Sequence, residues 1–226
     1  MKIQILSDLH NEFLGQGKYG PDHPWQGFIP ETDADIIILA GDIDTGSSGV
    51  EWAISESERL SKNIIYVPGN HEFYGFEYFA LKQKMARQCE GSRVILLDSA
   101  TTILQGVRFI GTTLWTDYEA DGKNSRQLTM DYIEAVLVDH RKITFKPGNI
   151  DRKFRPRDAL AIHIEALNWL ETQLVRPYPG KTVVVTHHGP HPLCQHPQYP
   201  LSEMSAAFHS DLSHFIDAHN MDVWVY

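Results

Sequence analysis

Residue types that bind metal ions recur along the chain, each just after a short apolar stretch. In chain order they are Asp8, His10, Asp42, Asn70, His71 and His187. Carboxylate oxygens, amide oxygens and imidazole nitrogens suit Mn, Fe or Zn ions, whereas a structural zinc site would favour the thiolates that this set lacks. The set therefore indicates a catalytic metal centre.

The number of these residues indicates more than one ion. Asp8, His10, Asp42 and His187 alone exceed what a single catalytic ion needs from the protein. Two ions about 3.5–4 Å apart, sharing one carboxylate, would use the surplus. We expect Asp42 to be the shared carboxylate. The same ligands accept Mn, Fe, Zn or Ni, so the sequence does not identify the metal.

The apolar, β-branched stretches that precede these residues are typical of strands. The predicted strands are Lys2–Leu6, Asp35–Leu39, Asn63–Val67, Arg93–Leu97, Thr101–Leu104, Val107–Ile110, Lys181–Val185 and Met221–Val225. Because the carboxyl ends of parallel strands lie along one edge of a sheet, side chains that follow different strands can converge there. The sequence therefore predicts that Asp8, Asp42, Asn70 and His187 meet.

Helices are predicted between the strands. Apolar residues at helical spacing form two stripes, over 160–174 and 204–219, and further helices are expected near 49–61, 76–90 and 126–138. Helices that alternate with almost wholly apolar strands indicate a partly parallel sheet covered on both faces. The run over 93–115 favours local antiparallel pairing, which would make the sheet mixed.

Length and composition indicate one soluble domain over residues 1–226. No apolar run approaches the roughly 18 residues that a membrane span needs, and no export signal is visible, so we expect a cytoplasmic protein without a membrane partner. A net charge of −9 disfavours long nucleic acids, whose phosphates require a basic surface. We expect Cys89 and Cys194 to be free thiols. The oligomeric state is left open.

Four motifs, in this order, resemble those of the calcineurin-like metallophosphoesterases. They are Asp8-Leu9-His10, Gly41-Asp42-Ile43-Asp44, Gly69-Asn70-His71-Glu72 and Thr186-His187-His188. Their combination is specific, although each alone would be a weak signal. The resemblance implies an α/β fold in which a mixed sandwich of two β-sheets is flanked by helices, giving four αββα layers. It also implies a hydrolase with a dinuclear metal site.

The resemblance also assigns ligands to each ion. Asp8 and His10 would hold the first metal, Asn70 and His187 the second, and Asp42 would bridge them.

Other residues of the motifs receive roles around this centre. The resemblance implies that His71 assists the leaving group or stabilises the phosphoryl oxygens, and Gly69 is expected to permit a tight turn. His188, Asp44 and Glu72 are expected to bind substrate or to support the ligands.

The pattern of the family ends with a strand followed by Gly-His-x-His. In this chain the predicted strand at 221–225 is followed by Tyr226 alone. We therefore expect a family domain that stops short of its C-terminal part, with weakened metal binding.

The sequence predicts a metal-dependent phosphoesterase. It would hydrolyse a small phosphorylated substrate, a phosphate mono- or diester, by attack of a metal-bridging hydroxide. Monoesterase, phosphodiesterase, nuclease and dinucleoside polyphosphate hydrolase activities share these motifs, so the substrate is left open. The alternative is a catalytically impaired family member that acts as a binding scaffold.

Overall fold

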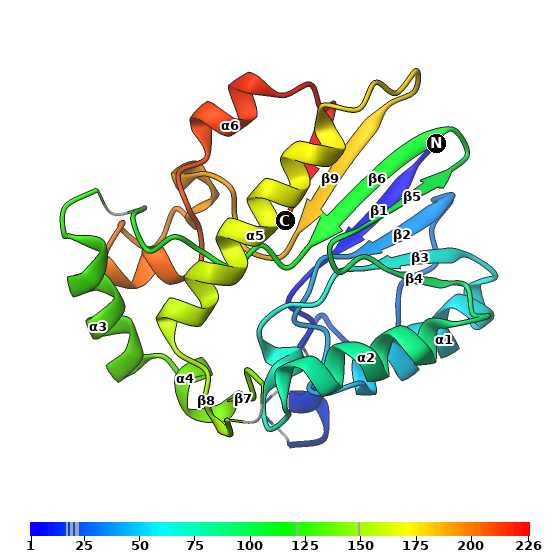
Figure 1. Ribbon diagram of the computed structural model, residues 1–226. Coiled ribbons are helices and arrows are strands. Elements are labelled where there is room, and N and C mark those ends of the chain that lie inside the picture. The colour runs from blue at the N-terminus through cyan, green and yellow to red at the C-terminus, as the bar shows by residue number, and fades with distance from the viewer. Residues whose placement is uncertain (17, 19, 21–22, 121, 149) are drawn as a thin grey trace.

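The computed structural model describes residues 1–16, 18, 20, 23–120, 122–148 and 150–226, and its centre is a pair of β-sheets (Figure 1). The first sheet has four parallel strands in the order β1-β2-β3-β4. Their bounds are Ile3–Leu6, Ile36–Leu39, Asn63–Tyr66 and Val94–Leu96. Each of the first three strands ends just before one of the predicted metal-binding motifs.

The second sheet is mixed and has the order β10-β9-β6-β5. The strands span, in that order, Val223–Val225, Thr182–Thr186, Val107–Thr112 and Ala100–Leu104. β9 pairs in parallel with both β10 and β6, whereas β5 and β6 form an antiparallel pair. The antiparallel pairing expected over 93–115 is therefore confined to β5 and β6, because β4 joins the first sheet in parallel with β3.

The two sheets pack face to face through an apolar core. Ile38 and Ile65 of the first sheet lie in one buried cluster with Phe109, Val183 and Val185 of the second. Because both faces of each central strand are covered, these strands are apolar at almost every position, as is typical of buried parallel sheets.

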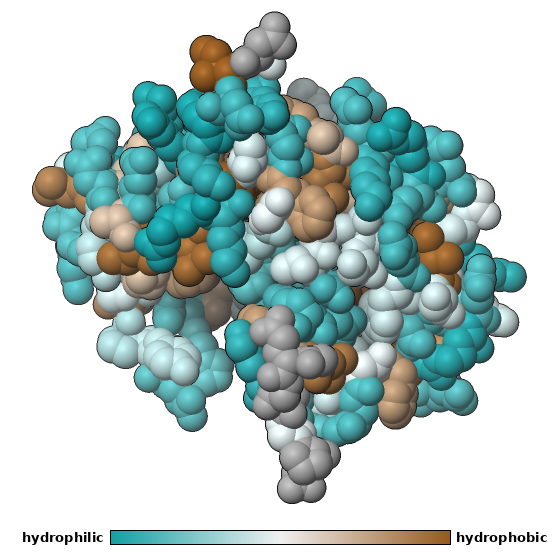
Figure 2. Space-filling view, turned by 90° about the horizontal axis from the view of Figure 1, so that it is seen from below, coloured by the Kyte–Doolittle hydropathy of each residue, from teal (hydrophilic) through white to brown (hydrophobic). Residues whose placement is uncertain are grey.

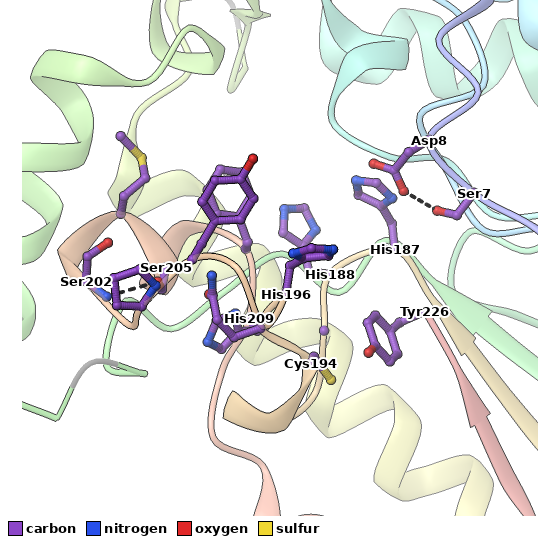
Figure 3. Close-up of a pocket in the computed structure, with 16 residues that line it drawn as sticks. Ser7, Asp8, His187, His188, Cys194, His196, Ser202, Ser205, His209 and Tyr226 are labelled. Carbon is purple, nitrogen blue, oxygen red and sulfur yellow. Dashed lines mark hydrogen bonds between the residues drawn. The ribbon is translucent and has the colours of Figure 1, made fainter. Parts of the chain in front are cut away.

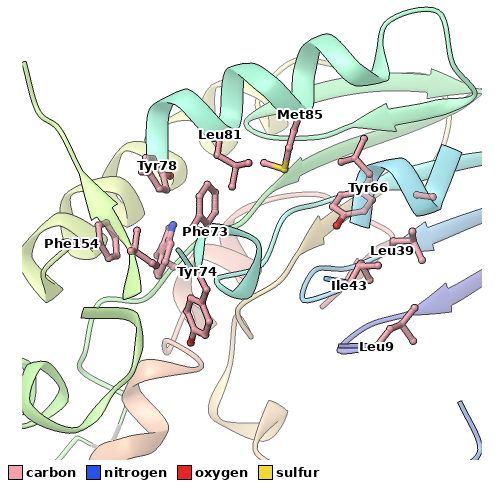
Figure 4. Close-up of a cluster of buried hydrophobic side chains, with 14 of the residues drawn as sticks. Leu9, Leu39, Ile43, Tyr66, Phe73, Tyr74, Tyr78, Leu81, Met85 and Phe154 are labelled. Atoms are coloured by element: carbon pink, nitrogen blue, oxygen red, sulfur yellow. The ribbon is translucent and has the colours of Figure 1, made fainter. Parts of the chain in front are cut away.

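Helices cover the two outer faces of the sandwich. α1 (Ser48–Leu60) and α2 (Tyr78–Cys89) pack on the first sheet, and Figure 4 shows Leu81 and Met85 extending from α2 into the shared cluster. α5 (Pro156–Leu174) packs on the second sheet, where Leu170 contacts the cluster around Val184. The predicted four-layer αββα arrangement is confirmed.

Shorter elements complete the chain. They are η1 (Asn11–Gln16), η2 (His71–Phe73), α3 (Arg126–Val136), α4 (Asp139–Lys142), β7 (Thr144–Phe145), β8 (Arg152–Lys153), η3 (Pro192–Cys194), η4 (Glu203–Ala207) and α6 (Ser213–Ala218). β7 and β8 pair as a separate two-stranded sheet.

The prediction of one helix over 204–219 was wrong. Residues 208–212 separate η4 from α6, because their backbone pairs with another segment instead of continuing a helix. Gly189 donates its N–H to the carbonyl of Phe208 at 2.9 Å, and its own carbonyl accepts the N–H of Ser210 at 3.0 Å. These tertiary bonds outweigh the helical spacing of the apolar residues.

Figure 2 displays one face of the outer surface, coloured by hydropathy. Outside the residues drawn in grey, that face is mostly hydrophilic, and its hydrophobic residues lie in separate small areas. None of the helices in the described ranges is long and apolar enough to cross a bilayer. Cys89 and Cys194 are free thiols, as predicted.

Candidate metal centre

The carboxyl ends of β1, β2, β3 and β9 bring the predicted ligands together at one edge of the sandwich. Asp42 lies at the centre of the group and is only 4% exposed. Its Oδ2 lies 4.0 Å from His10 Nε2, and its Oδ1 lies 3.4 Å from His187 Nε2. His10 Nε2 also lies 4.0 Å from Asp8 Oδ1. Asp42 thus presents one oxygen to each half of the site.

Three of these residues adopt a left-handed backbone conformation that residues other than glycine rarely adopt. The φ angles are 54° at Asp8, 47° at His10 and 55° at Asp42. Two backbone hydrogen bonds join the turns that carry them, from Asp8 N–H to Gly41 O at 3.1 Å and from His10 N–H to Asp42 O at 3.0 Å. Such strain persists where surrounding contacts fix it, and it is commonest at functional sites.

Two glycines make room for the predicted ligands His187 and Asp42. A Cβ at Gly41, whose φ is +94°, would lie 2.4 Å from His187 Nδ1, and a Cβ at Gly69 would lie 2.2 Å from Asp42 Oδ1. The backbone of Gly69 is not left-handed. The close approach to Asp42 Oδ1 therefore explains why position 69 is a glycine.

His187 is held with one ring nitrogen facing the site. Its Nδ1 lies 2.9 Å from the carbonyl oxygen of Ala40, which can only accept, so Nδ1 carries the proton and donates. Its Nε2 faces Asn70 Oδ1 at 3.1 Å as well as Asp42. Burial lowers the pKa of His187, but the negative charges of Asp42 and Asp8 outweigh it, and the net pKa is raised.

Asn70 is oriented by two buried residues, Tyr74 and Asp139. Its Nδ2 donates to Tyr74 Oη and to Asp139 Oδ1, each at 3.1 Å. Tyr74 donates its hydroxyl to the same Asp139 oxygen at 2.5 Å. With its amide nitrogen engaged, Asn70 presents its oxygen to His187, as a metal ligand requires.

Glu12 is a site residue that sequence reasoning missed. Its Oε1 lies 2.9 Å from His71 Nδ1 and 3.2 Å from His10 Nδ1, so one carboxylate orients two imidazoles. Burial raises the pKa of Glu12, but the hydrogen bonds from His10 and His71 outweigh it and lower the pKa to about 2. Its position two residues after His10 was the only signal, because no motif includes it.

Among the described residues, the carboxylate and imidazole atoms that could bind a metal ion form two overlapping clusters, each within 4.8 Å. One contains Asp8, His10 and Asp42, and the other contains His10, Glu12 and His71. His71 Nε2 lies 3.9 Å from Asp42 Oδ2, and the backbone N–H of His71 donates to Asp42 Oδ1 at 2.8 Å. The structure thus brings His71 together with the predicted ligands.

Glu72 lies beneath the site and is fully buried. Its carboxylate accepts the backbone N–H groups of Ile43 at 2.9 Å and Gly69 at 2.8 Å, and the hydroxyl of Tyr66 at 2.8 Å. Burial and the neighbouring charge of Asp42 raise the pKa of Glu72 to about 6. Glu72 thus joins the turns after β2 and β3 through buried hydrogen bonds.

Asp44 and His188 lie at the margin of the site. The Asp44 carboxylate accepts the N–H of Thr45 at 2.6 Å and does not join either cluster, and burial raises its pKa. His188 is buried, stacks on Trp115 at 5.3 Å and places Nδ1 3.2 Å from the carbonyl oxygen of Thr113. Burial, reinforced by the neighbouring His187, holds the pKa of His188 well below its usual value.

Two cavities open beside the ligands. The larger, of about 770 Å³, includes Asp8, His187 and His188 in its lining and extends to Tyr226 and His209. Figure 3 shows Asp8 and His187 close together at one end of it. The smaller cavity, of about 410 Å³, lies against Glu12, His71 and Tyr74.

The donor set fits divalent cations. Each imidazole with its Nδ1 engaged by a protein oxygen keeps Nε2 for coordination, and the oxygens of Asp8, Asp42 and Asn70 complete a mixed O and N set. Bound cations would also offset the repulsion between the crowded carboxylates of Asp8, Asp42 and Glu12.

Comparisons with known proteins identify the family to which the chain is similar. The model of the calcineurin-like phosphoesterase family matches residues 1–226. The uncharacterized protein L509 of Acanthamoeba polyphaga mimivirus is 25% identical over 244 residues, covering 99% of this chain and 82% of that protein. The [acyl-carrier-protein] phosphodiesterase PptH of Mycobacterium tuberculosis is 29% identical over 72 residues, which cover 32% of this chain and 21% of PptH.

The fold is also similar to a solved structure. The crystal structure of the phosphopantetheinyl hydrolase PptH from Mycobacterium tuberculosis superposes with a TM-score of 0.67 at 21% identity, covering 93% of this chain and 76% of that chain. At this identity the likeness concerns the fold.

Proposed function

The chain belongs to the calcineurin-like phosphoesterase family, and from this premise we propose that it hydrolyses a phosphate mono- or diester with two divalent cations held around Asp42. Family membership makes it a hydrolase of phosphoester bonds. The number of ions, the ligand assignments and the substrate are the parts that we propose.

The observation that carries the proposal is the position of Asp42 between two sets of donors. On one side lie Asp8 and His10, and on the other lie Asn70 and His187. This supports a first ion held by Asp8, His10 and Asp42, and a second held by Asp42, Asn70 and His187. When bound, the cations would supply a water of lowered pKa as nucleophile and neutralise charge on the phosphoryl oxygens.

His71 is the proposed general acid. Because Glu12 accepts from Nδ1 of His71, Nε2 faces the same space as Asp42 Oδ2, 3.9 Å away. In its protonated form this nitrogen donates to the departing oxygen of the ester, a role that suits an imidazole near neutral pH. Glu12 orients the ring by accepting the hydrogen bond from Nδ1.

The nature of the substrate is also proposed. We propose a small phosphorylated molecule, because the net charge of −9 disfavours long nucleic acids. PptH, which is similar in fold, is named as a phosphodiesterase, so a diester belongs in any test beside a monoester. A cytoplasmic location and a single domain over residues 1–226 stay predictions from the sequence.

The test is metal-dependent hydrolysis. The protein is stripped with a chelator, reloaded with Mn²⁺, and assayed with p-nitrophenyl phosphate and bis(p-nitrophenyl) phosphate. We expect the wild-type protein to hydrolyse at least one of the two esters. Asp42→Asn should abolish both this hydrolysis and the metal binding, which calorimetry measures. Asp33→Asn is the matched control, because Asp33 is an exposed residue whose carboxylate contacts Lys2.

One result would favour the scaffold alternative. If the reloaded protein binds the metal through Asp42 but hydrolyses neither ester, the phosphoesterase proposal fails.

A further inference from the structure

Two lysines that are not among the predicted metal ligands line the smaller cavity beside His71. Among the described residues that line it, Lys18 and Lys142 are the cationic side chains, and both are exposed. The only acidic residue in that lining is Glu12, whose Oε1 is already engaged by His10 and His71. Two positive charges in an otherwise acidic protein therefore face one cavity.

Each lysine stands on an aromatic ring that flanks His71. Lys18 Nζ lies 4.0 Å from the centre of the Phe13 ring, and the Phe13 ring lies edge-on to His71 at 6.4 Å. On the other side, Lys142 Nζ lies 5.0 Å from the Tyr74 ring, which packs on His71 at 4.2 Å. Cation–π attraction favours these positions for the ammonium groups.

The backbone that carries Lys142 is also fixed relative to His71. The carbonyl of Lys142 accepts the N–H of Gly75 at 3.2 Å, and Thr144 donates its N–H to the carbonyl of Phe76 at 2.9 Å. These bonds join the end of α4 to the loop that follows His71. Lys142 is thus presented to the cavity by a tethered segment.

From this geometry we propose that the cavity binds a second phosphate group of the substrate, on the leaving-group side of the scissile ester, between Lys18 and Lys142. The inference rests on the proposed function, because the scissile phosphate must lie at Asp42. Paired ammonium groups are effective point-charge partners for a phosphate dianion. A cavity of about 410 Å³ is within the usual range for small ligands. The substrate would then be a bisphosphorylated small molecule.

The test compares two probes that differ by one phosphate, propane-1,3-diol bisphosphate and propyl phosphate. Each is titrated into the Mn²⁺-loaded protein by calorimetry, and its hydrolysis is followed by release of inorganic phosphate. We expect the bisphosphate to bind about tenfold more tightly, and Lys18→Gln or Lys142→Gln each to reduce that preference about fivefold. Lys84→Gln, an exposed lysine of α2 outside the cavity, removes the same charge and should leave the preference intact.

The outcomes separate the two proposals. If the wild-type protein binds both probes equally, or if the Lys18 and Lys142 variants keep the preference, the second-phosphate site is refuted even where hydrolysis occurs. If neither probe is hydrolysed but the preference exists and depends on both lysines, the site stands and the phosphoesterase proposal fails.

Discussion

At the scale of single residues, the site depends on which ring nitrogen of each histidine is left to face Asp42. Glu12 engages Nδ1 of His10 and His71, and the carbonyl of Ala40 engages Nδ1 of His187. Three histidines therefore present Nε2 toward Asp42. Partners of this kind fix the tautomer and the ring orientation, and their loss commonly costs about 10- to 100-fold in metal affinity or activity.

We predict that Glu12→Gln lowers kcat/KM for p-nitrophenyl phosphate by about 10- to 100-fold. The amide keeps the shape of the side chain but loses the charge that holds two imidazoles. The measurement is steady-state kinetics of the Mn²⁺-loaded protein, with the melting temperature as a check on folding. Glu58→Gln, on the exposed face of α1, is the control, and equal activity of both variants would refute the role of Glu12.

At the scale of elements, the turns after the strands carry the predicted ligands, and the strands position the turns. The turn after β2 combines a left-handed Asp42 with Gly41, whose missing Cβ leaves space for His187. Strands of ordinary composition therefore lead into turns that few sequences can form.

Comparing Gly41→Ala with Gly75→Ala should separate the cost of backbone strain from the cost of a steric clash with His187. Both glycines have positive φ, +94° and +85°, but an added Cβ collides with His187 only at Gly41, whereas at Gly75 nothing lies within 4 Å. We expect Gly75→Ala to cost about 1 kcal/mol of unfolding free energy from backbone strain alone. Gly41→Ala should cost more in urea unfolding and should also weaken metal binding. Equal losses of stability with unchanged metal affinity would contradict the collision.

A second element-scale prediction concerns Glu56 of α1, which fastens the loop before β2. Glu56 accepts the N–H of Ile29 at 2.6 Å and the Nε of Arg59 at 2.8 Å. Burial raises the pKa of Glu56, but the hydrogen bonds from Arg59 and Ile29 outweigh it and lower the pKa below its usual 4.5. The carboxylate therefore stabilises the fold above that value and stops doing so as the pH falls through the lowered pKa.

Glu56→Gln should accordingly reduce the free energy of unfolding by about 1 kcal/mol at pH 7, with a smaller loss near pH 3. Urea unfolding at both pH values measures it. The exposed Glu58→Gln again serves as the control. If Glu56→Gln lost more unfolding free energy at pH 3 than at pH 7, the predicted direction of the pH dependence would be wrong.

At the scale of the whole molecule, the candidate metal centre spans the two sheets of the sandwich. Asp8, Asp42 and Asn70 follow strands of the first sheet, and His187 follows β9 of the second. Binding that engages both sheets stabilises the folded state as a whole, because the unfolded chain holds no such arrangement.

We therefore predict that Mn²⁺ raises the melting temperature of the protein. At 100 times its dissociation constant a ligand adds about 2.7 kcal/mol to the unfolding free energy. Differential scanning fluorimetry with and without chelator measures the effect, which Asp42→Asn should remove and Asp33→Asn should preserve. A metal-independent melting temperature in the wild-type protein would contradict binding at this centre.

The sequence predicted those parts of the molecule that depend on local pattern. Apolar runs located the strands, and the rule for strand ends brought Asp8, Asp42, Asn70 and His187 to one place, because both depend on periodicity and topology. The sequence did not predict the roles of Glu12 and Asp139, because each contacts a partner that only tertiary packing brings close. The supposed helix over 204–219 failed for a similar reason, since pairing with Gly189 is invisible to periodicity.

The bond between Asn70 and Asp139 limits how freely this protein could be re-engineered. Asp139 belongs to the peripheral stretch between the sixth and ninth strands, which a designer would regard as an interchangeable module for altering selectivity. Replacing that module with one that lacks Asp139 would also remove a hydrogen bond that orients the amide of Asn70. Chimeras should therefore retain Asp139 and Tyr74. Without them, we expect the hydrolytic activity to fall whatever the change in substrate selectivity.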